Sequence, residues 1–137
     1  MIPALLASTL CALGLLHVYW ALGGGRGQGV SVPEVAGRPA FRPSRTATFG
    51  VGLGLFGAAG IALVRGGLLG PALPGSPAHW AAIALGLVFV ARAVGEFRLV
   101  GFLKRVRGTP FARLDSWLYS PLSLLLGLGF LWIATLP

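Results

Sequence analysis

Four long stretches of the chain consist almost entirely of apolar residues, and short polar segments separate them. The stretches cover roughly residues 2–22, 46–64, 77–103 and 116–136. At a rise of about 1.5 Å per residue, each is long enough to cross a hydrocarbon core of about 30 Å as a helix. The pattern therefore predicts an all-α polytopic membrane protein, in which one domain forms a bundle of four transmembrane helices.

Two Ser/Thr-Pro pairs predict where helices begin. Ser76-Pro77 provides an N-cap followed by proline at the first helical position, and Thr109-Pro110 repeats the signal before a short interfacial turn. The segment before the second stretch is rich in Gly, Pro and Arg. We expect it to be irregular, and the sequence leaves open whether it is mobile or caps the bundle.

The charges of the chain fit a membrane protein better than a nucleic-acid-binding one. The sequence has 11 Lys and Arg against 3 Asp and Glu, a net charge of +8, and only 10% charged residues, whereas soluble domains average about 25%. The basic residues cluster in two loops. The first loop holds Arg26, Arg38, Arg42 and Arg45, the third holds Lys104, Arg105, Arg107 and Arg113, and the second holds only Arg65.

By the positive-inside rule, this asymmetry predicts that the first and third loops are cytoplasmic and that both termini lie outside. We therefore expect a multi-pass protein of the cell inner (plasma) membrane, with membrane lipids as partners and no nucleic acid. The basic run from Lys104 to Arg107 is expected to anchor the chain to anionic lipid.

Glycines and the single cysteine restrict the remaining chemistry. Gly50, Gly54 and Gly57 form one stripe of the second stretch, where small residues allow another helix to approach closely, so a homo-oligomer through this helix is one expectation. Cys11 is alone, which excludes an internal disulfide and a thiolate metal cage. His17 has no second histidine near it in sequence, so we expect no metal and no cofactor.

The polar and aromatic residues of three stretches fall at similar depth, near the predicted cytoplasmic leaflet. The first stretch brings His17 and Trp20, the third brings Arg92, Glu96 and Arg98, and the fourth brings Asp115, Trp117 and Tyr119. Charges at membrane depth are costly unless they are paired or hydrated, so these side chains should face the bundle interior or a cavity. The sequence thus predicts a membrane-embedded site.

Helical spacing suggests how these residues meet, and each also has a simpler explanation. Arg92 and Glu96 are four residues apart and can pair on one face, whereas Arg98 points elsewhere and can extend to lipid phosphate. Asp115 can instead serve as the N-cap of the fourth helix. The aromatic residues can belong to an interfacial belt. Pro121 leaves the Trp117 carbonyl without its usual helical partner, which favours either a kink or a cavity.

Three segments resemble a known family: His17 to Gly24, Gly95 to Lys104 and Thr109 to Pro121. The chain is similar, over nearly its whole length, to small bacterial four-helix membrane proteins catalogued only as a domain of unknown function. The resemblance implies the architecture and no activity. The residues that carry the family pattern here are His17, Trp20, Glu96, Arg98, Asp115, Tyr119 and Pro121. A looser analogy of fold alone connects this architecture to sterol isomerases and sigma-receptor-like bundles.

Three functions are consistent with this pattern. The first is an isomerase or cyclase of an apolar lipid or isoprenoid, in which Glu96 and Asp115 act as general acid and base and His17 relays a proton or orients a carboxyl group. Arg92, Arg98, Trp20, Trp117 and Tyr119 would bind the ligand, and the ring faces of Trp20 and Tyr119 would stabilise developing positive charge. The second is a non-enzymatic lipid-binding or accessory subunit whose polar cluster is structural. The third, a carrier of protons or ions, is weaker because the outer half offers few polar residues.

Overall fold

The computed structural model describes all 137 residues, and four helical spans dominate it. Helix α1 covers Ile2–Ala21, α2 covers Arg45–Arg65 and α3 covers Pro77–Val94. The last span consists of α4 (Pro110–Leu114), a π-helical turn η2 (Asp115–Tyr119) and α5 (Ser120–Ala134). All four spans are long and apolar enough to cross a membrane, which confirms the predicted all-α, four-helix membrane fold.

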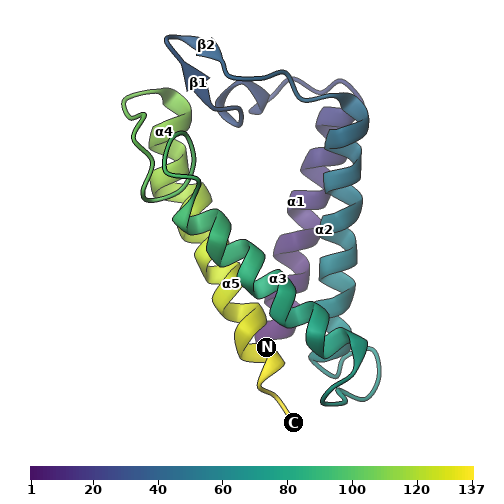
Figure 1. The fold of residues 1–137 in the computed structure, drawn as a ribbon. Helices are drawn as coiled ribbons and strands as arrows, with labels where there is room; N and C mark the ends of the chain where they lie inside the picture. The colour runs from purple at the N-terminus through teal and green to yellow at the C-terminus, as the bar shows by residue number, and fades with distance from the viewer.

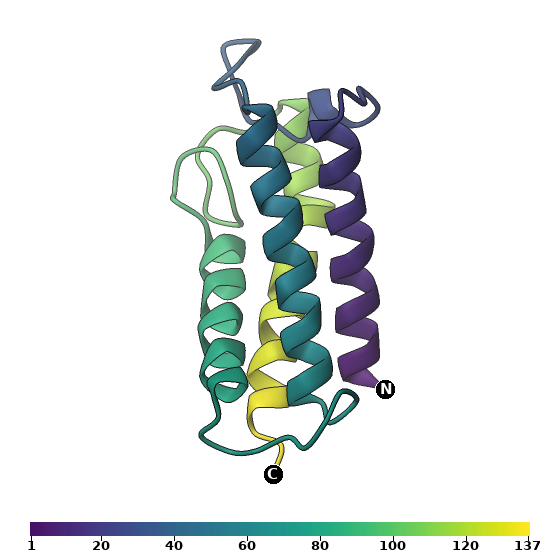
Figure 2. The same cartoon turned by 90° about the vertical axis from the view of Figure 1, so that its right-hand side faces the viewer.

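The four helices form two hairpins. Helix α1 lies along α2, and α3 lies along α5 (Figures 1 and 2). Both termini and the connection 66–76 lie at one end of the molecule, here called the terminal end. The connections 22–44 and 95–109 lie at the other end, here called the basic end. The hairpins converge at the terminal end and diverge toward the basic end (Figure 1).

The first loop, residues 22–44, bridges the gap between the hairpins at the basic end (Figure 1). It contains a 3-10 turn η1 (Gln28–Val30) and a small antiparallel ribbon of β1 (Glu34–Val35) and β2 (Arg38–Pro39), in which Glu34 lies opposite Pro39. Of the two alternatives that the sequence left open for this loop, the structure has the capping one.

Glycines let the helices of each hairpin touch backbone to backbone. In the first hairpin, a Cβ atom placed on Gly52 would lie 3.2 Å from the Gly14 carbonyl oxygen. In the second, a Cβ atom on Gly127 would lie 2.9 Å from the Gly86 carbonyl oxygen and 2.8 Å from Cγ2 of Val90. This close approach replaces the hydrophobic drive that lipid removes between helices.

The predicted glycine stripe plays no part in this packing. A Cβ atom on Gly50, Gly54 or Gly57 would meet nothing within 4 Å. The stripe therefore faces outward, and an oligomer contact through it stays a prediction.

The hairpins share a core at the terminal end. Leu6 and Leu10 of α1 are buried in the same apolar cluster as Phe130 and Ile133 of α5. A Cβ atom on Gly129 would lie 2.8 Å from Cδ2 of Leu6, so α1 and α5 are in direct contact there.

Arg65 links the two hairpins at this end. The residue is the last of α2 and is only 1% exposed, yet it donates hydrogen bonds to the carbonyl oxygens of Ala72 (3.2 Å), Ala134 (3.0 Å) and Leu136. The last carbonyls of a helix have no intrahelical partner. The guanidinium of Arg65, in the first hairpin, therefore supplies hydrogen-bond donors to carbonyl groups at the end of the second hairpin.

Two helix boundaries differ from those predicted. The third span was expected to extend to residue 103, but α3 ends at Val94, because Gly95 adopts a φ of 92° and its Cα packs against Gly101. The fourth was expected to begin at residue 116, but it begins at Pro110. Thr109 caps it by accepting a hydrogen bond from the Ala112 amide at 3.0 Å.

Gly127→Ala should destabilise the protein, because the added methyl group would overlap the backbone of α3. Overpacking costs about 1–3 kcal/mol, so the midpoint of thermal unfolding in dodecyl maltoside should fall. Gly54→Ala is the matched control, since it adds the same methyl group where space is open. Equal midpoints for the two variants would contradict the close packing of α3 on α5.

Arg65→Met should weaken the contact between the hairpins, because three carbonyl groups lose a charged donor. Hydrogen bonds to charged groups contribute about 1.5–3 kcal/mol, so we expect a loss of at least about 2 kcal/mol in the free energy of unfolding. Arg105→Met removes an exposed arginine and should leave stability unchanged. A stable Arg65→Met variant would show that the apolar core alone holds the hairpins.

Candidate functional site

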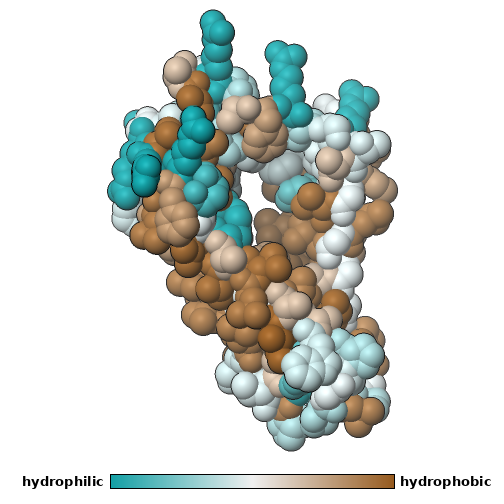
Figure 3. All heavy atoms as spheres, in the orientation of Figure 1, coloured by the Kyte–Doolittle hydropathy of each residue, from teal (hydrophilic) through white to brown (hydrophobic).

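A cavity of about 420 Å³ lies between the two hairpins, beneath the first loop. Figure 3 shows the molecule hollowed there, with hydrophilic residues gathered at the basic end. The apolar walls come from α1, α3, η2 and α5. They consist of Leu13, Leu16, Phe89, Leu118, Leu122 and Leu126, joined by Val30 and Phe111. The polar lining consists of His17, Trp20, Arg26, Ser31, Arg92, Tyr119 and Ser123. The cavity is thus apolar toward the terminal end, and its polar groups gather toward the basic end, beside Val30 and Phe111.

His17 has one ring nitrogen fixed by its own helix. Its Nδ1 lies 2.8 Å from the Leu13 carbonyl oxygen, and since a carbonyl only accepts, Nδ1 carries the proton. In the neutral ring Nε2 is then an acceptor. Trp20 packs edge-on against the imidazole, with ring centroids 5.2 Å apart, and its indole N–H donates to the Arg26 carbonyl oxygen at 2.8 Å. Helix α1 and the first loop therefore orient His17 together.

A second cavity, of about 530 Å³, lies on the other side of His17 and Trp20. It is formed by α1, α2 and the first loop. Ser31 lines both cavities as well, so these three residues make the partition between them.

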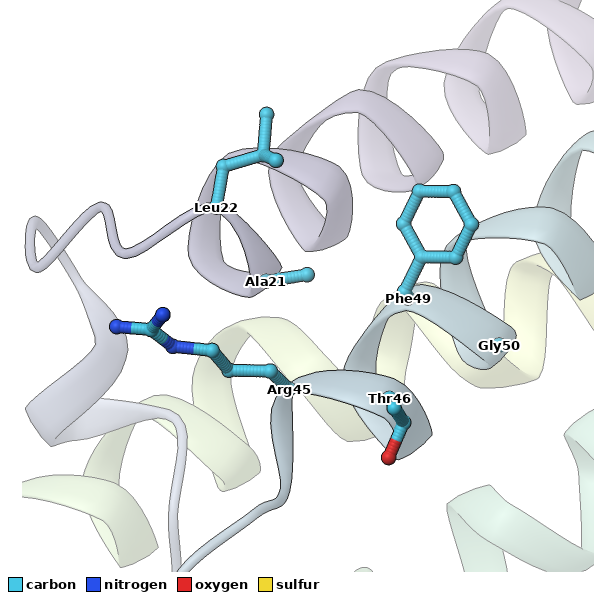
Figure 4. Close-up of a pocket in the computed structure, with 6 residues that line it drawn as sticks. All are labelled: Ala21, Leu22, Arg45, Thr46, Phe49 and Gly50. Carbon is cyan, nitrogen blue, oxygen red and sulfur yellow. The ribbon is translucent and has the colours of Figure 1, made fainter.

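A third depression is separate from the predicted site. Figure 4 shows it between the last turn of α1 and the first turn of α2, with Leu22, Arg45 and Phe49 among its lining residues. None of the site residues predicted from the sequence lines it.

Asp115 is completely buried and fully engaged in hydrogen bonds. Its Oδ1 accepts from Arg92 Nη2 at 2.8 Å, and its Oδ2 accepts from Lys104 Nζ at 3.0 Å and the Gly101 amide at 2.8 Å. Lys104 also donates to the Ser116 hydroxyl at 2.7 Å. The carboxylate therefore joins α3, the loop 95–109 and the last span. It is not an N-cap, because its helix begins five residues earlier.

This cluster contains more positive than negative charge. Arg92 and Lys104 both form ion pairs with the single carboxylate of Asp115. Arg92 Nη1 is buried and has no hydrogen-bond partner in the protein. Arg92 is also part of the cavity lining, whereas Asp115 and Lys104 are not. One cationic side chain thus connects the buried cluster to the cavity.

Glu96 does not pair with Arg92, contrary to the prediction. Because α3 ends at Val94, the two residues no longer share a helix face. Glu96 is exposed, and its Oε1 accepts from the amides of Leu99 and Val100 (the latter at 3.2 Å), so it stabilises a turn of the loop. It lines neither cavity.

The other predicted residues divide into two groups. Tyr119 lies in the cavity wall, packs against Phe111 with centroids 5.9 Å apart and donates to the Val30 carbonyl oxygen at 3.3 Å. Arg98 and Trp117 are exposed. The 86% exposure of Trp117 is consistent with a position in an interfacial aromatic belt. Neither lines the cavity. The structure therefore brings together His17, Trp20, Arg92 and Tyr119, with Asp115 behind Arg92, and leaves out Glu96, Arg98 and Trp117.

The π-helical turn before Pro121 sets where Asp115 and Tyr119 lie. The Ser120 amide bonds to the Asp115 carbonyl oxygen, five residues back. Proline at 121 removes the next amide donor, so a wider turn is tolerated here. π-helical turns occur frequently at functional sites.

The sequence did not identify the role of Lys104 or of the first loop. Lys104 was expected to help anchor the chain to anionic lipid. Its side chain is instead only 2% exposed and forms an ion pair with Asp115. Arg26 and Ser31 enter the cavity wall because the loop folds back over it. No motif marks these contacts. No group of three His, Cys, Asp or Glu side chains converges in a way that could hold a metal ion.

Comparison with known proteins gives a family and no activity. The chain belongs to the family described as "Protein of unknown function (DUF3995)", whose model matches residues 10–130. The predicted resemblance to small membrane proteins of unknown function is therefore confirmed. No curated protein and no solved structure matches the chain.

Asp115→Asn should destabilise the fold strongly, because Lys104 would be left buried without a counter-charge. Removing one partner of a buried pair costs about 3–5 kcal/mol, measurable as a lower thermal midpoint in dodecyl maltoside. The double variant Asp115→Asn with Lys104→Met should recover part of the loss. An unchanged midpoint for Asp115→Asn alone would mean that the cluster is hydrated and not structural.

Proposed function

We propose that this membrane protein binds a lipid-like, largely apolar molecule in the cavity between its two hairpins. The observation that carries the proposal is the composition of the cavity: leucine and phenylalanine side chains from three spans, with a few polar groups at one end. Its volume of about 420 Å³ falls in the range of about 300–1,000 Å³ typical of small-molecule sites. The apolar walls belong to membrane spans, so the ligand would enter from the bilayer.

Acid–base isomerisation or cyclisation has less support than binding. A general acid or base needs a titratable group free to exchange a proton with the ligand. Both oxygens of Asp115 are occupied by Arg92, Lys104 and Gly101, and Glu96 lies in a loop outside the cavity. Of the three residues predicted to act as acid–base groups, only His17 lines the cavity. The non-enzymatic alternative is therefore the function that we propose.

We also propose that the basic end faces the cytoplasm of a cell with this protein in its inner membrane. The support is the positive-inside asymmetry of the loops, because the first and third loops, which carry most of the basic residues, lie together at one end. A homo-oligomer through Gly50, Gly54 and Gly57 is consistent with the outward orientation of that stripe.

A variant with Trp20 as its single tryptophan tests ligand binding directly. Trp80, Trp117 and Trp132 are all exposed, so replacing each with Phe should not disturb the fold, and Trp20 lines the cavity. In phosphatidylcholine nanodiscs, dibrominated stearate should quench Trp20 fluorescence in a saturable way. Quenching that rises linearly with the probe concentration would mean that bromine contacts Trp20 only from bulk lipid.

Adding Ser123→Phe to this variant should weaken the saturable quenching about tenfold or more, because the ring would occupy the cavity. Leu125→Phe is the matched control: it lies two residues away on α5 and is 67% exposed, so it should change nothing. Equal quenching curves for the two variants would overturn the proposal that this cavity is the binding site.

A further inference from the structure

We infer that the molecule bound in the cavity carries an anionic oxygen, in a carboxylate or a phosphate, that Arg92 binds. The inference rests on the lipid binding proposed above and specifies the ligand class: a single-chain amphiphile with an anionic head group.

The first argument is the unused donor on Arg92. Its guanidinium offers five N–H groups, and Nη2 donates to Asp115 at 2.8 Å. Nη1 is buried and has no partner in the protein. Buried donors in native structures nearly always have a partner. The Arg92 side chain is 34% exposed and lines the cavity, so a ligand oxygen there has access to guanidinium N–H groups that Asp115 leaves free.

The second argument is charge. Asp115 forms ion pairs with both Lys104 and Arg92, so the cluster carries one positive charge in excess, and the Arg92 side chain, which is 34% exposed, brings that charge to the cavity. The cavity wall adds Arg26, and no carboxylate residue lines the cavity. An uncompensated charge at membrane depth is costly, and an anionic head group would neutralise it. Arginine also matches the planar geometry of carboxylate and phosphate oxygens.

The third argument is the polarity along the cavity. Helix α3 runs toward the basic end, so Arg92 lies about one turn beyond Phe89 in that direction. Leu122 and Leu126 line the cavity from α5, which runs the opposite way. A head group at Arg92 would therefore place its hydrocarbon chain along Phe89 and the leucines. The volume of about 420 Å³, low in the usual range, suits one chain better than two.

Three ligands with the same hydrocarbon chain test the inference: oleate, oleyl phosphate and oleyl alcohol. Their dissociation constants for the wild-type chain can be measured by native mass spectrometry from dodecyl maltoside. At least one anion should bind about tenfold or more tightly than the alcohol, because hydrogen bonds to charged groups are stronger than neutral ones. The ratio between oleate and oleyl phosphate then distinguishes carboxylate from phosphate.

Arg92→Lys tests the residue assignment while keeping a cation next to Asp115. It removes the free guanidinium arm, so binding of the preferred anion should weaken about tenfold while oleyl alcohol binding stays the same. Arg98→Lys is the matched control, since Arg98 is exposed and lines neither cavity. If Arg92→Lys does not fold, the wild-type comparison of the three ligands still decides the question.

The outcomes separate this inference from the proposed function. If oleyl alcohol binds wild type as tightly as both anions, and Ser123→Phe weakens all three, lipid binding stands and the anionic head group is refuted. If Arg92→Lys folds and binds the anion like wild type, Arg92 is not the recognition group and the inference fails. If no ligand binds wild type saturably, the proposed function and the inference both fail.

Discussion

Hydrogen bonds join the two hairpins at only two places, and the difference between those places determines the shape of the molecule. At the terminal end the buried guanidinium of Arg65 donates to the Ala134 and Leu136 carbonyl oxygens, next to the apolar core. At the basic end the Tyr119 hydroxyl donates to the Val30 carbonyl oxygen in the first loop at 3.3 Å. The two hairpins therefore pack together at the terminal end, whereas at the basic end they are separated and the first loop bridges them. The cavity is a consequence of that asymmetry.

The Asp115 cluster provides rigidity of a different kind, within the second hairpin. Lipid offers no hydrogen bonds, so a buried carboxylate must find all its partners in the protein. Arg92 comes from α3, Lys104 and the Gly101 amide come from the loop, and Asp115 itself belongs to the last span. The loop 95–109 is thereby fixed to both helices that it connects. The helices that this loop connects form one wall of the cavity, and the Asp115 cluster holds Arg92 in place there.

Hydropathy predicted all four spans, because a continuous apolar run long enough to cross the bilayer is visible in the sequence itself. It failed at the end of α3, since Phe97 to Leu103 is nearly as apolar as the helix before it. The helix stops because Gly95 and Gly101 pack backbone on backbone, and composition does not reveal that contact. The expected Arg92–Glu96 pair depended on an uninterrupted helix and was wrong for the same reason.

The structure brings His17, Trp20, Arg92 and Tyr119 to one cavity, and the depth argument had grouped them because helix direction and register follow from the spans. It could not find Lys104 as a partner of Asp115. That contact requires the loop to fold back on itself, and a lysine in a basic run is more simply explained by its position near lipid head groups. The role of Arg65 could not be predicted either, because the sequence around a single arginine at a helix end does not show which carbonyl groups the arginine will bond to.

The two ends of the bundle differ in how many contacts must break before the hairpins separate there. Separating the hairpins at the terminal end would expose Arg65 and the core around Phe130 to lipid, and the hydrogen bonds from Arg65 to the Ala134 and Leu136 carbonyl oxygens would be lost. Moving the first loop away from the second hairpin breaks one hydrogen bond and the packing of η1 against α4. The Asp115 cluster is undisturbed by that movement, because none of its partners belongs to the first loop. Of the two ends, the basic end is therefore the less costly one to open toward the bilayer, and opening it there leaves the ion pair of Arg92 with Asp115 intact.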